Sequence, residues 1–212
     1  MKIYRSFHSY LKSTYETAVR RICVDGGFTC PNRDGTVGVG GCIFCGERGA
    51  GEHLPKEEPI RAQVTKYFST RPKWKKYILY FQNFSGTYAP PEVLRARYDE
   101  GLSVDPRIVV LSIGTRPDCI TEEIAALLES YLDRVDVWVE LGLQTSKEET
   151  ARFCNIGYPR ARFEEAVEIL HRHHIKVIVH LLLGLPGCYR GESDGVETLP
   201  DDRVAENHLE AV

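Results

Sequence analysis

The rest of this chain is built around one stretch, FTCPNRDGTVGVGGCIFCG, residues 28–46. It carries Cys30, Cys42 and Cys45 at a C-x11-C-x2-C spacing, in a segment too rich in Gly, Pro, Asn and Asp for a helix or a strand. A long loop without secondary structure in a compact domain is usually either functional or disordered. Three thiols gathered on one such loop favour a functional site.

These thiols fit more than one kind of site. The glycines allow positive φ angles, so the loop can fold back and bring Cys30 towards the Cys42-x-x-Cys45 pair. A structural zinc site needs four ligands, and His53 is the nearest candidate for the fourth. An iron–sulfur cubane held by only three cysteines keeps an open coordination position on one iron. Cysteines that merely pack in a reduced loop are the third possibility.

Length and composition indicate one globular domain of a soluble protein. The chain has 212 residues, 42% of them hydrophobic, and a net charge of -3, which gives no general signal for nucleic-acid binding. The first residues lack the apolar core of a signal peptide, and no apolar run approaches membrane-spanning length. Seven cysteines, an odd number, argue against a disulfide framework. We therefore expect a cytoplasmic protein with no membrane partner.

Residues 1–19 are polar and aromatic without a clear helical or strand period, and we expect them to pack against the domain. After them, strand-like and helix-like segments alternate. The predicted strands are residues 18–25, 77–82, 107–113, 135–141 and 176–183. Three predicted helices are residues 59–68, 91–100 and 162–173. A further helix is predicted to begin after Thr121, which caps it, and another at a capping box formed by Ser146 and Glu149. Apolar strands joined by helices indicate a parallel sheet with right-handed crossovers. The pattern predicts an α/β fold, an incomplete (β/α) barrel, with an open doubly wound sheet as the alternative.

Polar residues follow the predicted strands at their carboxyl ends, where a barrel enzyme assembles its active site. Gln82-Asn83-Phe84-Ser85-Gly86-Thr87 follows the second strand, and Gly114-Thr115-Arg116-Pro117-Asp118 the third. Glu140 and Gln144 lie on and after the fourth strand, and His180 precedes Gly184-Leu185-Pro186-Gly187 on the fifth. Each has a structural alternative: Glu140 as a salt-bridge partner, the glycines as turn residues, His180 as a core residue.

The ending Cys42-Ile43-Phe44-Cys45 resembles that of radical SAM enzymes, although their usual spacing is C-x3-C-x2-C. The longer first interval resembles the branch of the Elongator catalytic subunit, in particular a group of uncharacterised bacterial radical SAM proteins. The words GFTCPNRDG, IGTRPD, E-x-G-x-QT and H-x3-GLPG are similar to that group as well. The resemblance covers roughly residues 4–187 and implies a partial TIM-like barrel with about five of the usual six strands.

The resemblance implies a [4Fe–4S] cluster on Cys30, Cys42 and Cys45, and S-adenosylmethionine on its open iron. By position, Ser85, Gly86 and Thr87 would reach the amino group of S-adenosylmethionine. Glu140 and Gln144 would reach its ribose or carboxylate, and Phe44, Leu183, Gly184 and Leu185 its adenine. Arg116, Asp118 and His180 are assigned to the substrate side, and no catalytic residue is assigned. The family implies an electron donor such as flavodoxin or ferredoxin; tRNA as substrate follows by analogy alone.

Two departures from the group accompany the resemblance. Asn155-Ile156-Gly157-Tyr158 has Tyr where the group has His, which weakens a catalytic role for that position. After Gly187 the familiar pattern ends, and no sixth strand is predicted in the acidic segment 188–212. We expect a radical SAM core over residues 1–187 and a poorly ordered, divergent tail, left by a truncation or a frameshift. The alternatives are a non-catalytic zinc- or cluster-binding module and an inactive fragment.

Overall fold

Five parallel strands form one sheet in the computed structural model, which describes residues 5–55, 57–71 and 73–186. Their order in the sheet follows the chain: β1 (Val19–Val24), β2 (Lys76–Phe81), β3 (Ile108–Thr115), β4 (Asp136–Gln144) and β5 (Lys176–Leu181). A doubly wound sheet reverses its strand order at a switch point. Because this sheet does not, the barrel-type prediction is confirmed. The predicted tail, residues 188–212, lies outside the described residues.

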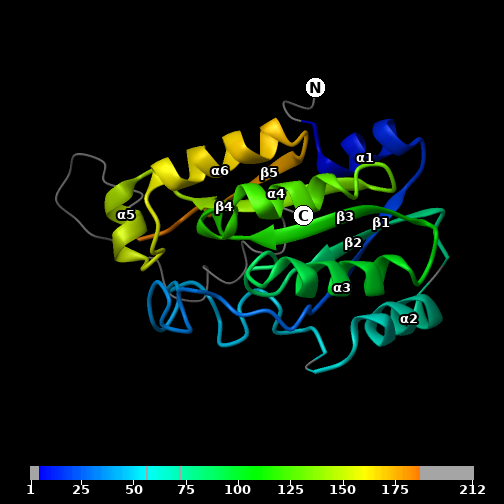
Figure 1. The fold of residues 1–212 in the computed structure, drawn as a ribbon, viewed down its shortest axis with the longest axis horizontal. Helices are drawn as coiled ribbons and strands as arrows, with labels where there is room; N and C mark the ends of the chain where they lie inside the picture. The colour runs from blue at the N-terminus through cyan, green and yellow to red at the C-terminus, as the bar shows by residue number, and fades with distance from the viewer. Residues whose placement is uncertain (1–4, 56, 72, 187–212) are drawn as a thin grey trace.

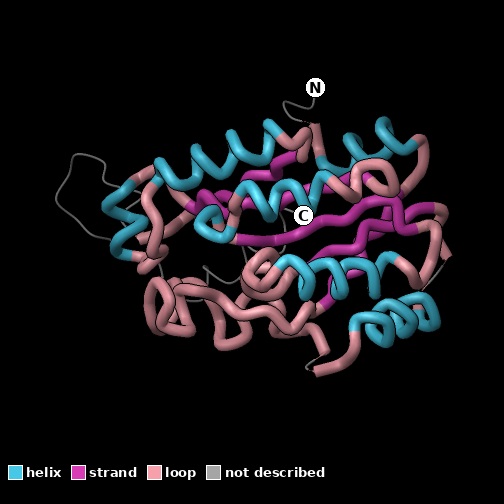
Figure 2. Tube along the Cα trace, in the orientation of Figure 1, coloured by secondary structure: helices cyan, strands magenta, loops and turns pink. Residues whose placement is uncertain are grey.

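The connecting helices lie on one face of the sheet. They are α2 (Ile60–Thr70), α3 (Pro91–Leu102), α4 (Glu122–Glu129) and α6 (Arg160–Arg172), with a 3-10 turn η1 at Pro117–Cys119. The short α5 (Glu148–Phe153) lies instead at the end towards which the strands point. In Figure 1, α3, α4 and α6 cross in front of the strands, and Figure 2 separates the helices from the sheet by colour. Strand residues such as Leu79, Leu111 and Val139 are fully buried beneath this layer and form the main core.

Thr121 caps α4 as predicted, because its side chain accepts a hydrogen bond from the amide of Ile124. The capping box predicted for α5 is wrong. The N-cap residue is Lys147 rather than Ser146, and the Lys147 side chain makes no capping hydrogen bond. The hydroxyl of Thr145 accepts the Lys147 amide at 3.2 Å, so a local turn places the N-cap one residue after Ser146.

The concave face of the sheet is covered at its amino-terminal end by α1 (Phe7–Tyr15). Ser6 caps this helix by accepting the amide of Ser9. The rings of Phe7 and Tyr10 lie 6.0 and 6.2 Å from that of Trp138, which is fully buried on the same face. The start of the chain does pack against the domain, as expected, but as a helix that the sequence analysis did not predict.

Strand β5 is the exposed margin of the described sheet. Within the described part of the chain it pairs only with β4, and Val179, Leu181 and Leu183 expose 44%, 57% and 76% of their surface. Of the helices described, none is long and apolar enough to cross a membrane.

The parallel strands all end at the same side of the sheet, which is where the loop between β1 and α2 lies. Figure 1 shows this loop, blue to cyan, below α5 at the end towards which the arrow of β3 points. The cysteine loop therefore stands over the carboxyl ends of the strands, as barrel enzymes require of a catalytic loop.

Candidate metal centre and active site

The cysteine loop is folded by hydrogen bonds of its own backbone. The carbonyl of Cys30 accepts the amides of Arg33 and Asp34, and the carbonyl of Cys42 accepts that of Cys45. The guanidinium of Arg33 then binds the carbonyls of Cys45, Gly46 and Glu47 at 3.0, 2.6 and 3.2 Å. Arg33 thereby ties the first part of the loop to the last, across the eleven residues that separate Cys30 from Cys42.

The three cysteines form one electrostatic unit. Cys30 is buried, and Cys42 and Cys45 are partly buried. Interaction with Cys45, together with burial, raises the pKa of Cys42, whereas the same interaction, with Arg33 and Arg116 nearby, lowers the pKa of Cys45 against the effect of burial. The two thiols therefore titrate as a pair, Cys45 before Cys42. Metals bind the thiolate form of cysteine.

Three cysteine thiolates are a donor set that an iron–sulfur cubane can use. Within the described ranges, no three His, Cys, Asp or Glu side chains converge closely enough to share one metal ion. Three cysteines of a cubane each bind a different iron, so their sulfurs need not meet at one point. His53, the fourth ligand of the zinc alternative, has an exposed side chain.

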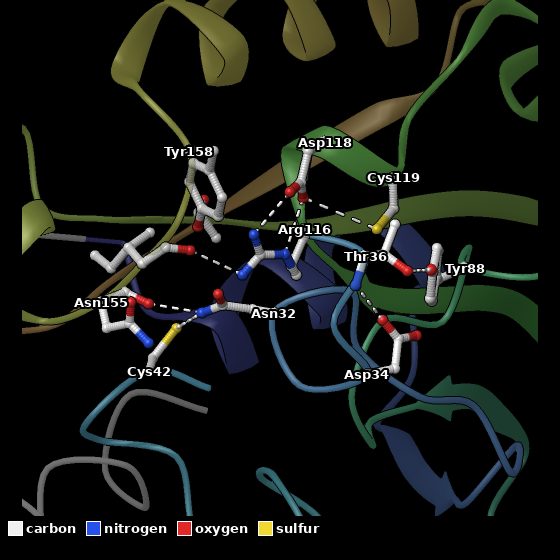
Figure 3. A network of polar contacts seen from close by, with 12 residues as sticks. Asn32, Asp34, Thr36, Cys42, Tyr88, Arg116, Asp118, Cys119, Asn155 and Tyr158 are labelled. Atoms are coloured by element: carbon white, nitrogen blue, oxygen red, sulfur yellow. Dashed lines mark hydrogen bonds and ion pairs between the residues drawn. The ribbon is translucent and has the colours of Figure 1, made fainter. Parts of the chain in front are cut away.

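A second segment, residues 154–158 between α5 and α6, holds the loop from its other side (Figure 3). The amide of Ile43 donates to the carbonyl of Cys154 at 3.1 Å. The side-chain amide of Asn32 donates to the carbonyl of Asn155 at 2.6 Å, and that of Asn155 donates to the carbonyl of Gly41 at 2.7 Å. Sequence analysis assigned no role to Asn32 or Asn155, although Asn32 lies within the cysteine stretch that it singled out.

Arg116 and Asp118 lie beside this segment, and their charged atoms are already paired. Arg116 Nε and Nη2 bind the two carboxylate oxygens of Asp118 at 2.9 and 2.7 Å, and Nη1 donates to the carbonyl of Ile156 at 2.9 Å. The guanidinium carbon lies 4.7 Å from the ring centre of Tyr158, whose hydroxyl donates to the carbonyl of Gly142. This arrangement braces the segment against the strands.

The turn after β2 is held in place from several sides. The amide of Gly86 donates to the carbonyl of Gly114, and Thr87 shares a hydrogen bond with Thr115 and donates to the carbonyl of Cys119. Ser85 is fully buried, and its hydroxyl oxygen lacks a well-formed hydrogen bond within the described chain. Of the three predicted residues, Ser85 alone keeps side-chain capacity for a ligand.

Glu140 lies on the concave face and is almost completely buried. Its carboxylate accepts hydrogen bonds from Ser112 at 2.5 Å and from Arg21 Nη1 at 3.4 Å. It also forms an ion pair with Arg21 Nη2 at 2.9 Å and contacts His180 Nε2 at 2.9 Å. Burial raises the pKa of Glu140, but His180, Arg21 and Ser112 outweigh it, so the pKa is below its ordinary value. Glu140 is thus an ionised centre with partners from three other strands. The Arg-Arg pair in the first strand was the one sequence signal for Arg21.

The residues predicted to contact the adenine of S-adenosylmethionine separate into two groups in the structure. Leu185 is buried in a small apolar cluster with Cys154 and Ile156, against which Cys42 and Phe44 pack. Leu183 is largely exposed, and Gly184, at φ 85°, has no atom within 4 Å of the Cβ it lacks. The structure therefore brings Phe44 and Leu185 together beside the cysteines. Gln144, also at positive φ, accepts the amide of Leu182 through its carbonyl and sits at the exit of β4.

A barrel-type α/β sheet with three thiols over its strand ends is the architecture of a cluster-dependent enzyme. The family model described as Radical SAM superfamily matches residues 30–192. The chain belongs to this superfamily, an enzyme family whose members bind a [4Fe–4S] cluster and S-adenosylmethionine.

Proteins of three organisms define the relationship more closely. The chain is 35% identical over its full length to "Protein YhcC" of Escherichia coli K12, and it spans 67% of that protein. It is 39% identical to YtqA of Bacillus subtilis, and this match covers 87% of the chain and 58% of YtqA. It is 37% identical to tRNA uridine(34) acetyltransferase of Methanocaldococcus jannaschii, over 40% of this chain and 15% of that one.

Solved structures share the fold. Elp3 of Methanocaldococcus infernus superposes with a TM-score of 0.56 at 19% identity, covering 81% of this chain and 39% of that one. The structure of anSMEcpe with bound AdoMet gives a TM-score of 0.51 at 14% identity, over 76% and 43% of the two chains. The predicted Elongator-like radical SAM branch is confirmed by these likenesses together.

Proposed function

We propose that this chain binds a [4Fe–4S] cluster through Cys30, Cys42 and Cys45 and uses it to cleave S-adenosylmethionine reductively. The observation that carries the proposal is the loop itself: three thiols above the strand ends, inside a loop braced from both sides. The open iron left by a three-cysteine set is where S-adenosylmethionine would bind.

When bound, the reduced cluster supplies the electron that splits a carbon–sulfur bond of S-adenosylmethionine and gives a 5′-deoxyadenosyl radical. The residues of the chain bind, orient and shield. Phe44 and Leu185 would pack on the adenine, with Leu183 and Gly184 beside them, and Ser85 in the turn with Gly86 and Thr87 would take the amino group.

Polar side chains at the ends of the strands complete the proposed site. Gln144 and Glu140 would reach the ribose or the carboxylate, Glu140 by exchanging one of its present partners. His180, whose side chain is 40% exposed, stays on the substrate side of the proposal. Arg116 and Asp118 fit a supporting role instead, because each satisfies the charge of the other.

The test is anaerobic reconstitution of the purified chain with iron and sulfide, followed by electron paramagnetic resonance of the reduced protein. We expect a [4Fe–4S]⁺ signal that changes when S-adenosylmethionine is added. The triple variant Cys30→Ala, Cys42→Ala, Cys45→Ala should lose it, whereas Cys23→Ala, which removes a partly buried thiol on β1, should keep it. A signal that survives the triple variant would refute the assignment of the ligands.

Metal analysis separates the alternatives. Stoichiometric zinc that depends on the three cysteines, without a cluster, would support a zinc module. A cluster that ignores S-adenosylmethionine would support a non-catalytic cluster-binding module. The inactive-fragment alternative predicts poor folding, which a comparison of melting curves with a chain extended by the part of YhcC that this chain does not match would reveal.

The substrate class that we propose is tRNA, and the support for it is the printed name of one relative, tRNA uridine(34) acetyltransferase. A gel-shift titration of the reconstituted protein with total tRNA tests it, and binding no stronger than to poly(A) would count against it. We propose a flavodoxin or a ferredoxin as reductant and the cytoplasm as the location, as expected for a protein that relies on reduced thiols.

A further inference from the structure

Asn32 occupies the centre of the contacts that join the cysteine loop to residues 154–158. Its side chain is 1% exposed, which is rare for an amide and requires that its polar atoms be satisfied. Two glycines make room for it: a Cβ added to Gly38 would lie 2.4 Å from Asn32 Oδ1, and one added to Gly157 would lie 2.9 Å from it. Gly157 also has φ 81°, which glycine adopts without strain. The two glycines thus leave the space that this one side chain fills.

The two N–H groups of the Asn32 amide point to different partners. Nδ2 lies 2.6 Å from the carbonyl of Asn155 and 3.7 Å from Cys42 Sγ, and both are within hydrogen-bonding reach for their atom types. The first bond is short and fixes the orientation of the amide plane. Figure 3 shows the amide between Cys42, Asn155 and Arg116. The same group therefore holds the loop and offers an N–H to a cysteine sulfur.

The orientation of this amide is fixed from the opposite side as well. Asn155, at φ 51°, donates its own side-chain amide to the carbonyl of Gly41, the residue before Cys42. The neighbouring carbonyl of Ile156 is held by Arg116, which is itself fixed by Asp118. Each segment thus donates a side-chain amide to the backbone of the other, and 123 residues of sequence separate the two asparagines.

We propose that Asn32 is a positioning residue that donates an N–H···S hydrogen bond to the Cys42 thiolate and so raises the reduction potential of the bound cluster. This inference rests on the proposed function. A donor to a ligand sulfur stabilises negative charge, and the reduced cluster carries one more negative charge than the oxidised cluster, so the donor favours reduction. The second N–H, on the Asn155 carbonyl, keeps the donor from turning away when the thiolate binds iron.

The test compares Asn32→Leu, which removes the donor and keeps the approximate shape, with Asn155→Ala, which loosens the loop and leaves the Asn32 donor in place. Each protein is reconstituted, its iron and sulfide are measured, and its cluster is titrated by electron paramagnetic resonance without S-adenosylmethionine. For Asn32→Leu we expect the equilibrium constant for one-electron reduction to fall about tenfold, a shift of about 59 mV to lower potential. For Asn155→Ala we expect less iron but an unchanged potential in the clusters that form.

A further variant keeps the inference testable if Asn32→Leu fails to fold or to take up iron. Asn32→Asp retains the shape and replaces the donor by an oxygen, so the potential should fall at least as far. An unchanged potential in a loaded Asn32 variant, or an equal fall in Asn155→Ala, would overturn the inference. If the wild-type chain takes up no cluster, the proposed function fails first; if it loads normally and only these comparisons disagree, the role of Asn32 alone fails.

Discussion

Replacing Arg21 by Met should destabilise the fold strongly, because it leaves the Glu140 carboxylate buried without its permanent counter-charge. Arg21 Nη2 and Nη1 lie 2.9 and 3.4 Å from the two oxygens of Glu140, which is 2% exposed. Breaking a buried ion pair by removing one partner costs about 3–5 kcal/mol. The Arg21 guanidinium also lies over the ring of Tyr80 at 4.3 Å, a contact worth about 0.5–1 kcal/mol.

Two remaining partners limit the loss. Ser112 still donates to one oxygen, and His180 still contacts the other, so the carboxylate is not bare. Hydrogen bonds to charged groups contribute about 1.5–3 kcal/mol each. We therefore expect Arg21→Met to lose about 3 kcal/mol of unfolding free energy, the lower end of the range for a broken buried ion pair. Urea denaturation followed by circular dichroism measures this loss.

A double variant and the pH dependence make the reasoning refutable. Arg21→Met with Glu140→Gln removes both charges and should be more stable than Arg21→Met alone. The lowered pKa of Glu140 contributes stability above its ordinary value of about 4.5, and this stability is lost as the pH falls through the folded-state pKa. The deficit of Arg21→Met should therefore be larger at pH 7 than at pH 4. A loss below about 1 kcal/mol, or a double variant less stable than the single one, would refute the argument.

Two smaller predictions follow from the same structure. Gly157→Ala should lose more unfolding free energy than Gly35→Ala in urea denaturation. Both glycines lie at positive φ, which costs alanine about 1–2 kcal/mol, but only Gly157 has a buried neighbour, Asn32, where the Cβ would go. Equal losses would mean that the packing of Gly157 against Asn32 is not tight. His173 contacts Glu129 at 2.8 Å and Glu122 at 3.0 Å, and these carboxylates raise the pKa of His173. The stability that these contacts contribute is complete below the ordinary histidine pKa of about 6.5 and is lost as the pH rises through the raised folded-state pKa. His173→Gln should thus lower the melting temperature at pH 6 but not at pH 9, and 0.5 M NaCl should shrink the difference; an equal effect at both pH values would exclude the ion pairs as its cause.

The sequence predicts the central strands well because β2, β3 and β4 are almost completely buried. Observed and predicted strands differ by at most three residues at their ends, since nearly continuous apolar runs such as that of β3 leave no other assignment. The missed α1 shows the limit of this reasoning. Phe7, Tyr10, Leu11 and Tyr15 do recur at helical spacing, but the helix is short and half exposed, and it packs on the concave face, where the alternation of strands and helices predicts no helix.

For the candidate site, sequence patterns identify the chemistry and only the fold identifies the supports. The spacing of Cys30, Cys42 and Cys45 is local and can be recognised in one loop. The contact between Asn32 and Asn155 depends on how α5 and α6 are placed over β4, and no local pattern carries that information. Arg116 illustrates the same point. Its sequence motif places it on the substrate side, but in the structure its charge is paired with the carboxylate of Asp118.

The Glu140 carboxylate also explains how an open sheet can keep the curvature of a barrel. Neighbouring strands lie about 4.8 Å apart, so in a flat sheet the backbones of β1 and β4 would be separated by about 14 Å, with side chains perpendicular to the sheet. Arg21 from β1 nevertheless reaches Glu140 on β4, which also meets His180 from β5. Curvature must turn these side chains towards one centre. Because β1 and β5 are the two ends of the described strand order, this carboxylate links both margins of the sheet where no backbone ladder does. Its loss should therefore loosen β1 and β5 in hydrogen exchange before it affects β3, whereas uniform loosening would mean that the helix layer alone sets the curvature.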